Sequence, residues 1–118
     1  MHDLAPRQLA RTLADDSRLT IIALLDGHGP LCVCELVHAL DAPQPRISQH
    51  LARLRAAGLV RHRRVANRHY YGLAPDLPGW ATRIVEGYRL GLARDDAFHR
   101  AADRLLTMPD RPPRVLAA

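Results

Sequence analysis

Residues 43–60 read PQPRISQHLARLRAAGLV, and this stretch decides the fold. The proline at position 45 suits the first turn of a helix, because its missing N–H would find no partner there, and Gly58 suits the helix end. Between them, apolar residues recur every three or four positions, as on the buried face of a helix. They are Ile47, Leu51 and Leu54. The stretch predicts an amphipathic helix over about residues 45–57.

The opposite face of this helix combines small residues with hydrogen-bond donors. Ala52 and Ala56 permit close approach to another surface, and Arg and Gln side chains can pair with guanine and adenine in the major groove of DNA. The candidates for DNA contact are Arg46, Ser48, Gln49, Arg53 and, at the edge of this face, His50. For His50, contact with DNA and packing between helices are equally open.

Three shorter helices are expected before this one. The first covers residues 4–13, and Asp15 or Asp16 caps a second that ends at residues 27–30, Gly-His-Gly-Pro. The third covers residues 31–40 and stops at Asp41-Ala42-Pro43. A short helix, a tight turn and a helix with an exposed donor face form a helix-turn-helix, which places its second helix in the major groove.

The hydrophobic pattern changes to period two after Gly58. Residues 59–65 and 69–73 form two β-rich runs around a turn that contains Asn67, and they predict a hairpin. Its arginines can reach flanking phosphates or a minor groove, and the candidates are Arg63, Arg64 and Arg68. The expected fold is mainly α with a small β-hairpin, a winged helix-turn-helix.

The charge distribution agrees with this interpretation. The chain has 118 residues and a net charge of +5, and all of its 17 basic residues are Arg. Residues 42–75 contain seven of these arginines and no Asp or Glu. Such a basic stretch indicates a surface that meets a polyanion, although a solvated charged face would have the same composition.

A long helix over residues 79–106 is expected to follow. Its apolar residues recur at a 3-4 spacing and offer more apolar surface than one small domain can cover, which suggests that it packs against another copy. We therefore expect one domain over residues 1–107 and a flexible, proline-containing tail over residues 108–118. The chain shows neither a signal peptide nor the run of about 20 apolar residues that a membrane span needs, so a cytoplasmic protein without membrane contact is expected.

Four segments of these elements stand out together: LCVCEL at 31–36, PQPRISQHL at 43–51, LRAAGLV at 54–60 and YYGL at 70–73. They resemble the corresponding segments of the ArsR/SmtB family of metal-responsive repressors. The resemblance implies a homodimer, joined through its first and last helices, that leaves its operator DNA when an inducer binds. In the arsenic-sensing branch the Cys-Val-Cys motif, here Cys32 and Cys34, supplies thiolates to trivalent arsenic or antimony, which soft sulfur ligands suit.

The third ligand is not evident from the sequence. That branch often has a further cysteine where this chain has Val37, and His38, on the same helix face as Cys34, is a candidate extra ligand. On an ideal helix over residues 31–40 the sulfurs of Cys32 and Cys34 would point apart, so that binding one ion would require the first turn to unwind.

Two other interpretations of the cysteines stay open. A repressor of this family could respond to thiol oxidation, to another metal or to a non-metal inducer. A thiol enzyme would need Cys-x-x-Cys beside a βαβ pattern, which the chain lacks, and no Ser/His/Asp set or phosphate-binding loop is present. We therefore expect a DNA-binding protein and not an enzyme. RNA binding is disfavoured because only two aromatic residues lie in the basic region.

Overall fold

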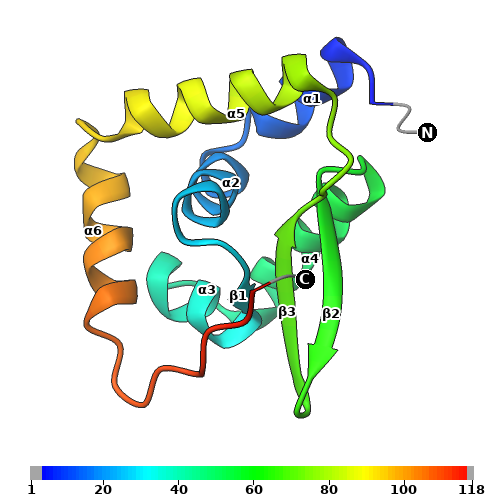
Figure 1. The fold of residues 1–118 in the computed structure, drawn as a ribbon. Helices are drawn as coiled ribbons and strands as arrows, with labels where there is room; N and C mark the ends of the chain where they lie inside the picture. Colours follow the sequence, from blue (N-terminus) through cyan, green and yellow to red (C-terminus); the bar gives the residue numbers. More distant parts are fainter. Residues whose placement is uncertain (1–3, 117–118) are drawn as a thin grey trace.

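The computed structural model describes residues 4–116, which form six helices and a small sheet around one core. The helices are α1 (Pro6–Leu13), α2 (Asp16–His28), α3 (Val33–Leu40), α4 (Gln44–Ala56), α5 (Gly79–Leu92) and α6 (Asp96–Leu106). The strands are β1 (Leu31–Cys32), β2 (Val60–Val65) and β3 (Arg68–Leu73). The expected fold class, mainly α with a hairpin wing, is confirmed (Figure 1).

Helix α2 lies at the centre of the molecule. The residues from Ile21 to Leu25 are all buried, as expected of a helix with neighbours on every side. It contacts α1, α4, α5, α6 and β3. Asp15 begins the helix, since its carboxylate accepts a hydrogen bond from the Arg18 N–H at 3.0 Å. The other elements are arranged around this helix.

The helix-turn-helix consists of α3 and α4, which are separated by three residues. Asp41 ends α3 in the left-handed conformation (φ 50°), and α4 begins at Gln44, one residue before the predicted start. Ile47, Leu51 and Leu54 are buried as the sequence predicts. Their burial fixes the rotation of α4 and turns its donor-rich face outward.

The hairpin is confirmed, and its turn explains its geometry. Strands β2 and β3 pair from Val60↔Leu73 to Val65↔Arg68, and the two turn residues, Ala66 and Asn67, have φ of 50° and 67°. Positive φ at both positions is the geometry of the tight turn that matches the twist of a hairpin. A third strand, β1, was not predicted; it pairs antiparallel with β3, so that the strand order is β1-β3-β2.

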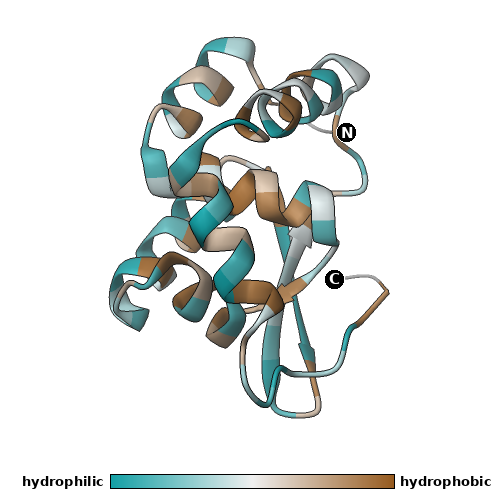
Figure 2. Cartoon of the chain, turned by 90° about the vertical axis from the view of Figure 1, so that its left-hand side faces the viewer, coloured by the Kyte–Doolittle hydropathy of each residue, from teal (hydrophilic) through white to brown (hydrophobic). Residues whose placement is uncertain are grey.

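The prediction of one helix over residues 79–106 is wrong. Helix α5 ends at Leu92, and Asp95 starts α6 by accepting the Phe98 N–H at 2.9 Å. Helix α6 then turns down toward α3 (Figure 1), where Arg104 Nε donates to the Ala39 carbonyl at 2.7 Å. The break lets α6 bury Ala101 and Leu105. Figure 2 shows the mixture of hydrophilic and hydrophobic residues expected of such a helix.

The C-terminal segment folds back over the body of the protein. Residues 108–116 contain no helix or strand, yet they run past α3 and the sheet (Figure 1), and we call them the strap. The predicted flexible tail thus corresponds to a segment with defined contacts. Residues 117–118 of the predicted tail, like residues 1–3, lie outside the described part of the chain. No helix among residues 4–116 has both the length and the apolar character needed to cross a membrane.

Candidate functional site

The two cysteines lie at the junction of the sheet and the helix-turn-helix. Cys32 ends β1, opposite Tyr70 of β3, and Cys34 is in the first turn of α3. Their Sγ atoms are 2.9 Å apart. The prediction that the sulfurs point apart is wrong, because Cys32 is extended (φ −71°, ψ 150°) and precedes the helix. The two thiols can therefore engage one ion without any unwinding of α3.

The two thiols differ in their surroundings. Cys32 is buried and Cys34 is exposed, and both are free. Partial burial of Cys34, together with the Cys32 sulfur beside it, raises the pKa of the Cys34 thiol to about 11. The raised pKa of Cys34 favours its protonated thiol at neutral pH.

Glu35 holds the segment Cys32-Val33-Cys34, which we call the cysteine loop, and we did not predict this role. Its side chain is 4% exposed; Oε1 accepts the Cys32 N–H at 2.8 Å and Oε2 accepts Arg111 Nε at 2.6 Å. A signal was present in the sequence, because Cys-x-x-Glu has the spacing of a capping box with Cys in the place of Ser or Thr. The contribution of Arg111, 76 residues away, had no such local signal.

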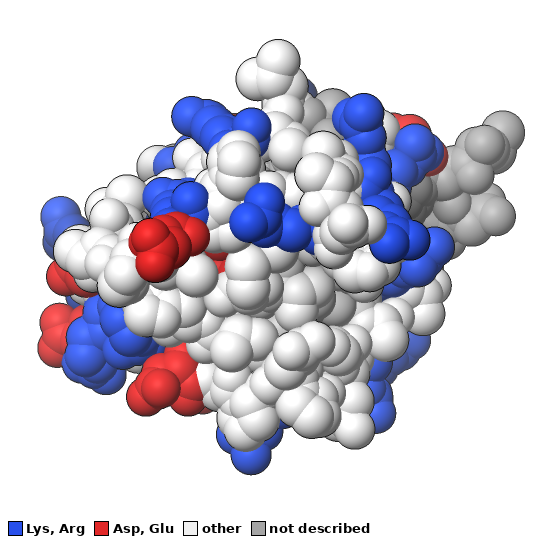
Figure 3. All heavy atoms as spheres, turned by 90° about the horizontal axis from the view of Figure 1, so that it is seen from below, with Lys and Arg blue, Asp and Glu red and all other residues white. Residues whose placement is uncertain are grey.

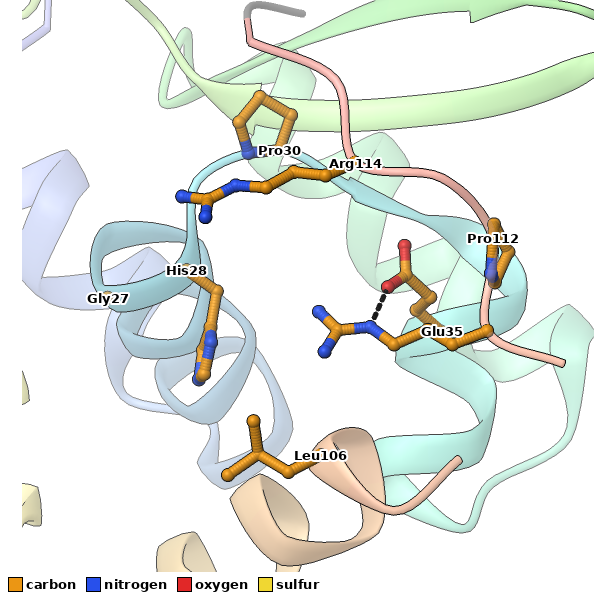
Figure 4. A pocket seen from close by; sticks show the side chains of 8 residues that line it. Gly27, His28, Pro30, Glu35, Leu106, Pro112 and Arg114 are labelled. Atoms are coloured by element: carbon orange, nitrogen blue, oxygen red, sulfur yellow. Dashed lines mark hydrogen bonds and ion pairs between the residues drawn. The ribbon is translucent and has the colours of Figure 1, made fainter. Parts of the chain in front are cut away.

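The strap reaches the same loop at a second point. Tyr70, the partner of Cys32 in the sheet, donates its hydroxyl to the Pro113 carbonyl at 2.8 Å. Figure 4 shows the cavity of about 400 Å³ beneath the strap, with His28 and Arg114 on one side and the ion pair of Glu35 on the other. Burial and the nearby Arg111 and Arg114 lower the pKa of His28. The two strap contacts, Arg111 with Glu35 and Pro113 with Tyr70, thus act on residues that position Cys32.

The described residues fit a soft ion through two sulfurs and no more. Residues 4–116 contain no group of three or more His, Cys, Asp or Glu side chains placed to hold a metal ion. His38, the candidate third ligand, is therefore not brought to the cysteine pair. Two neighbouring thiols are suitable donors for trivalent arsenic or antimony, because soft sulfur ligands bind soft ions.

A second cavity opens beside the cysteine pair. It has a volume of about 450 Å³ and lies between the start of α3, the start of α4 and the tip of the hairpin. It is lined by Cys32, Val33, Cys34, Gln44, Ser48, Asn67, Arg68, His69 and Tyr71. The cysteines therefore share a cavity with residues of the two elements predicted to contact DNA.

Helix α4 presents most of the predicted contact residues to solvent. Arg46, Ser48, Gln49 and Arg53 are exposed. His50 is different: its side chain is 14% exposed, Nδ1 lies 3.4 Å from Arg18 Nη1, and Nε2 lies 3.9 Å from the Asp15 carboxylate. Its neighbours at the start of α2 favour a packing role for His50.

The hairpin, or wing, carries the remaining predicted residues. Arg63, Arg64 and Arg68 are exposed, and Arg64 Nη2 donates to the Asn67 side chain at 2.9 Å, across the turn. Figure 3 shows the molecule from below: arginines are spread over this face, and most of the visible acidic side chains lie toward the left, the side on which Figure 1 places α6. Helix α4, which we call the recognition helix, and the wing lie within residues 42–75, which contain seven Arg and no Asp or Glu, so they form a donor-rich, acid-poor surface.

Helix α5 leaves large apolar side chains uncovered. Ile84, Tyr88 and Leu90 are 40%, 43% and 58% exposed. Gly87 and Gly91, on the same helix, have open space where a Cβ would be. Ile84 and Tyr88 are one turn apart on the same face of α5, and this exposed strip is part of the apolar surface that we predicted to contact another copy of the chain.

Comparison with known proteins agrees with this architecture. Residues 15–62 match the model of the family described as "Bacterial regulatory protein, arsR family". The chain is 48% identical over 86 residues to the arsenical resistance operon repressor of Escherichia coli K12, covering 73% of this chain and 74% of that protein. The chain belongs to the ArsR family. This ArsR-family protein is a winged helix-turn-helix transcriptional repressor and not an enzyme.

Further relatives of this ArsR-family protein cover more of the chain or share its fold. The arsenic resistance transcriptional regulator ArsR1 of Pseudomonas putida KT2440 is 41% identical over 109 residues, 92% of this chain and 84% of that protein. The structure of HlyU from Vibrio cholerae N16961 has a TM-score of 0.66 at 31% identity and covers 75% of this chain and 91% of that one. The structure of the AntR antimony-specific transcriptional repressor has a TM-score of 0.58 at 30% identity and covers 72% of this chain and 71% of that one.

Proposed function

We propose that this protein is a homodimeric repressor that binds double-stranded operator DNA and is released when trivalent arsenic or antimony binds Cys32 and Cys34. The observation that carries the proposal is the 2.9 Å separation of two free thiols at the start of the helix that precedes α4. The named activities of the E. coli and P. putida relatives and of AntR support the same class of inducer.

The outward face of α4 and the wing would form the DNA interface. The residues that would contact the major groove are Arg46, Ser48, Gln49 and Arg53. His50 would pack against the start of α2 and would add no more than one further contact with DNA. Arg63, Arg64 and Arg68 would contact flanking phosphates or a minor groove. We expect the protein to act in the cytoplasm, because its operator DNA is there.

The position of the cysteines explains how their ligation could change DNA binding. Cys32 is hydrogen-bonded through β1 to β3 of the wing, whereas Cys34 belongs to α3, which is three residues from α4. Restraining both sulfurs together therefore restrains the wing relative to the recognition helix. An inducer can shift this equilibrium only by binding one arrangement more tightly than the other.

Dimer formation would use α5 and α1. The exposed strip of α5 needs a partner, and a second copy of the chain meets that need with a self-complementary surface. Helix α6, which we had predicted to continue the same long helix as α5, packs on α3 and is less available for this contact.

The test is a fluorescence-anisotropy titration on the DNA upstream of the protein's own coding region, repeated with arsenite, antimonite, cadmium and zinc. Wild type should bind and be released by arsenite or antimonite, and Cys34→Ser should bind without being released. Binding that is indifferent to every ion would refute the metalloid inducer while leaving the repressor.

Thiol oxidation is the second candidate signal, favoured by the same 2.9 Å separation of the sulfurs. Hydrogen peroxide would take two electrons and two protons from the thiols, giving one disulfide and two waters. Release of DNA by peroxide but not by arsenite would favour this signal, although a disulfide between Cys-x-Cys residues closes a small ring.

A further inference from the structure

The cavity beside the cysteines has a size and a charge that the metalloid ion alone does not require. Its volume of about 450 Å³ lies within the range of small-molecule sites, about 300–1,000 Å³. Its lining includes Arg68 and His69 from the wing and polar side chains from Gln44, Ser48 and Asn67, but no Asp or Glu. This combination favours an anionic occupant.

The chain also lacks one ligand. Its sequence contains two cysteines, and among the described residues no His, Asp or Glu joins them in a group of three. Trivalent arsenic forms three bonds, so one of them must be made to a group that the described residues do not supply. Cys34 is exposed and both cysteines line the cavity, which therefore adjoins the position of that third bond.

We propose that a small anionic thiol occupies this cavity and supplies the third sulfur to arsenic held by Cys32 and Cys34. The inference rests on the proposed function and adds to it the chemical class of a co-inducer. The thiol's sulfur faces the cysteine pair, and its carboxylate faces Arg68 and His69.

The reaction balances without an oxidant. Arsenous acid, As(OH)₃, exchanges three As–O bonds for three As–S bonds, two to the protein and one to the small thiol. Each thiol proton leaves with one hydroxide, so that three waters are released and arsenic stays trivalent. No electron transfer occurs in this exchange.

The occupied cavity would also affect the DNA surface directly. Arg68 is an exposed arginine at the wing tip, and Ser48 is on the outward face of α4. A carboxylate that binds the Arg68 guanidinium competes with a DNA phosphate for the same donors. Arsenic with the anionic thiol should therefore release DNA at lower arsenite concentrations than arsenic alone.

The experiment compares three thiols of similar size on the full chain, pre-reduced with a phosphine. Arsenite is titrated calorimetrically without thiol and with mercaptoacetate (anionic), mercaptoethanol (neutral) or cysteamine (cationic), and native mass spectrometry records the composition of the complex. We expect a ternary complex of protein, one arsenic and one mercaptoacetate, with arsenite bound about tenfold more tightly than with cysteamine, as for one charge-assisted contact.

A variant pair assigns the effect to the cavity. Arg68→Gln should remove most of the preference for mercaptoacetate over cysteamine, whereas Arg61→Gln should retain it, because Arg61 is on the wing but does not line the cavity. Each variant is compared with its own thiol-free affinity.

The outcomes separate the two proposals. Arsenite binding without a ternary complex, or equal enhancement by all three thiols, would overturn the co-inducer and leave the proposed function. Failure of arsenite to bind under every condition would overturn both.

Discussion

Glu35 is the side chain on which the position of Cys32 most depends. Burying a carboxylate is costly unless its oxygens are hydrogen-bonded or paired, and here one oxygen accepts the Cys32 N–H and the other accepts Arg111. Arg111 of the strap thus pairs with the buried Glu35 carboxylate, and the effect of removing Arg111 can be measured.

Replacing Arg111 by alanine should lower the free energy of unfolding by about 1–3 kcal/mol, because the 4%-exposed Glu35 loses its charged partner. Urea denaturation at pH 7 measures this. Arg114→Ala is the matched control in the same strap, and a change within about 0.5 kcal/mol is expected, since Arg114 lines the cavity without pairing with Glu35. Equal losses in the two variants would show that the ion pair contributes nothing specific.

The pKa of Cys34 gives a prediction at alkaline pH. It is raised from an ordinary value of 9.0 to about 11, so folding favours the protonated thiol. The resulting stabilisation should be complete below pH 9 and should disappear as the pH rises toward 11. The difference in unfolding free energy between wild type and Cys34→Ser, measured at intervals from pH 8 to 11, should therefore fall across this range. A difference that stays constant would contradict the raised pKa.

At the scale of elements, local and non-local signals had different success. The amphipathic pattern of α4 and the period-two runs of the wing are local, and both elements could be predicted from the sequence. Strand β1 could not, because Leu31 and Cys32 are extended only through pairing with Tyr71 and Tyr70 of β3, which lie 40 and 38 residues further along the chain. The geometry of the cysteine pair depends on this pairing, which is why the sulfurs were wrongly expected to diverge.

Two alanine-to-glycine substitutions, one in the wing turn and one in α4, should have opposite effects on the free energy of unfolding. Ala66 has a φ of 50°, which costs a residue with a Cβ more than it costs glycine, so Ala66→Gly should raise the unfolding free energy by a few tenths to about 1 kcal/mol. Ala52→Gly, on the exposed face of α4, should lower it by about 1 kcal/mol. Thermal melts of both variants check the signs, and destabilisation by both would argue against the left-handed turn.

Recognition helix and wing should differ in how they bind DNA. Arg53→Ala should weaken binding to the operator more than to unrelated DNA. Arg68→Ala should weaken binding to both alike and reduce the slope of log K against log salt by about one unit. Anisotropy titrations at several salt concentrations measure both quantities; no change in either for Arg68→Ala would remove the wing from the interface.

For the whole molecule, the break between α5 and α6 separates two roles. The spacing of seven residues between Gly91 and Phe98 spans residues 93–95, so periodicity alone predicted one helix, whereas α5 ends at Leu92 and the Asp95 side chain caps the start of α6. Helix α6 completes the core on α3, and α5 keeps the exposed strip for association.

Disrupting that strip should yield monomers. Ile84→Arg places a charge at the centre of the proposed dimer contact, and sedimentation equilibrium should show the mass of a single chain, together with weaker operator binding. Leu116→Arg, at a residue that is 97% exposed, is the control and should leave the dimer intact. A dimer that survives Ile84→Arg would place the contact elsewhere.

The middle position of β3 in the sheet offers a way to follow how the wing responds to an inducer. At Tyr70 and Tyr71 the strand is flanked by β1 on one side and β2 on the other, whereas the rest of the wing has a partner on one side. Backbone amides in this short stretch should exchange with deuterium more slowly than those near the turn. Their exchange rates would then report, within a single experiment, whether the cysteine loop tightens or loosens its hold on the wing when an inducer arrives.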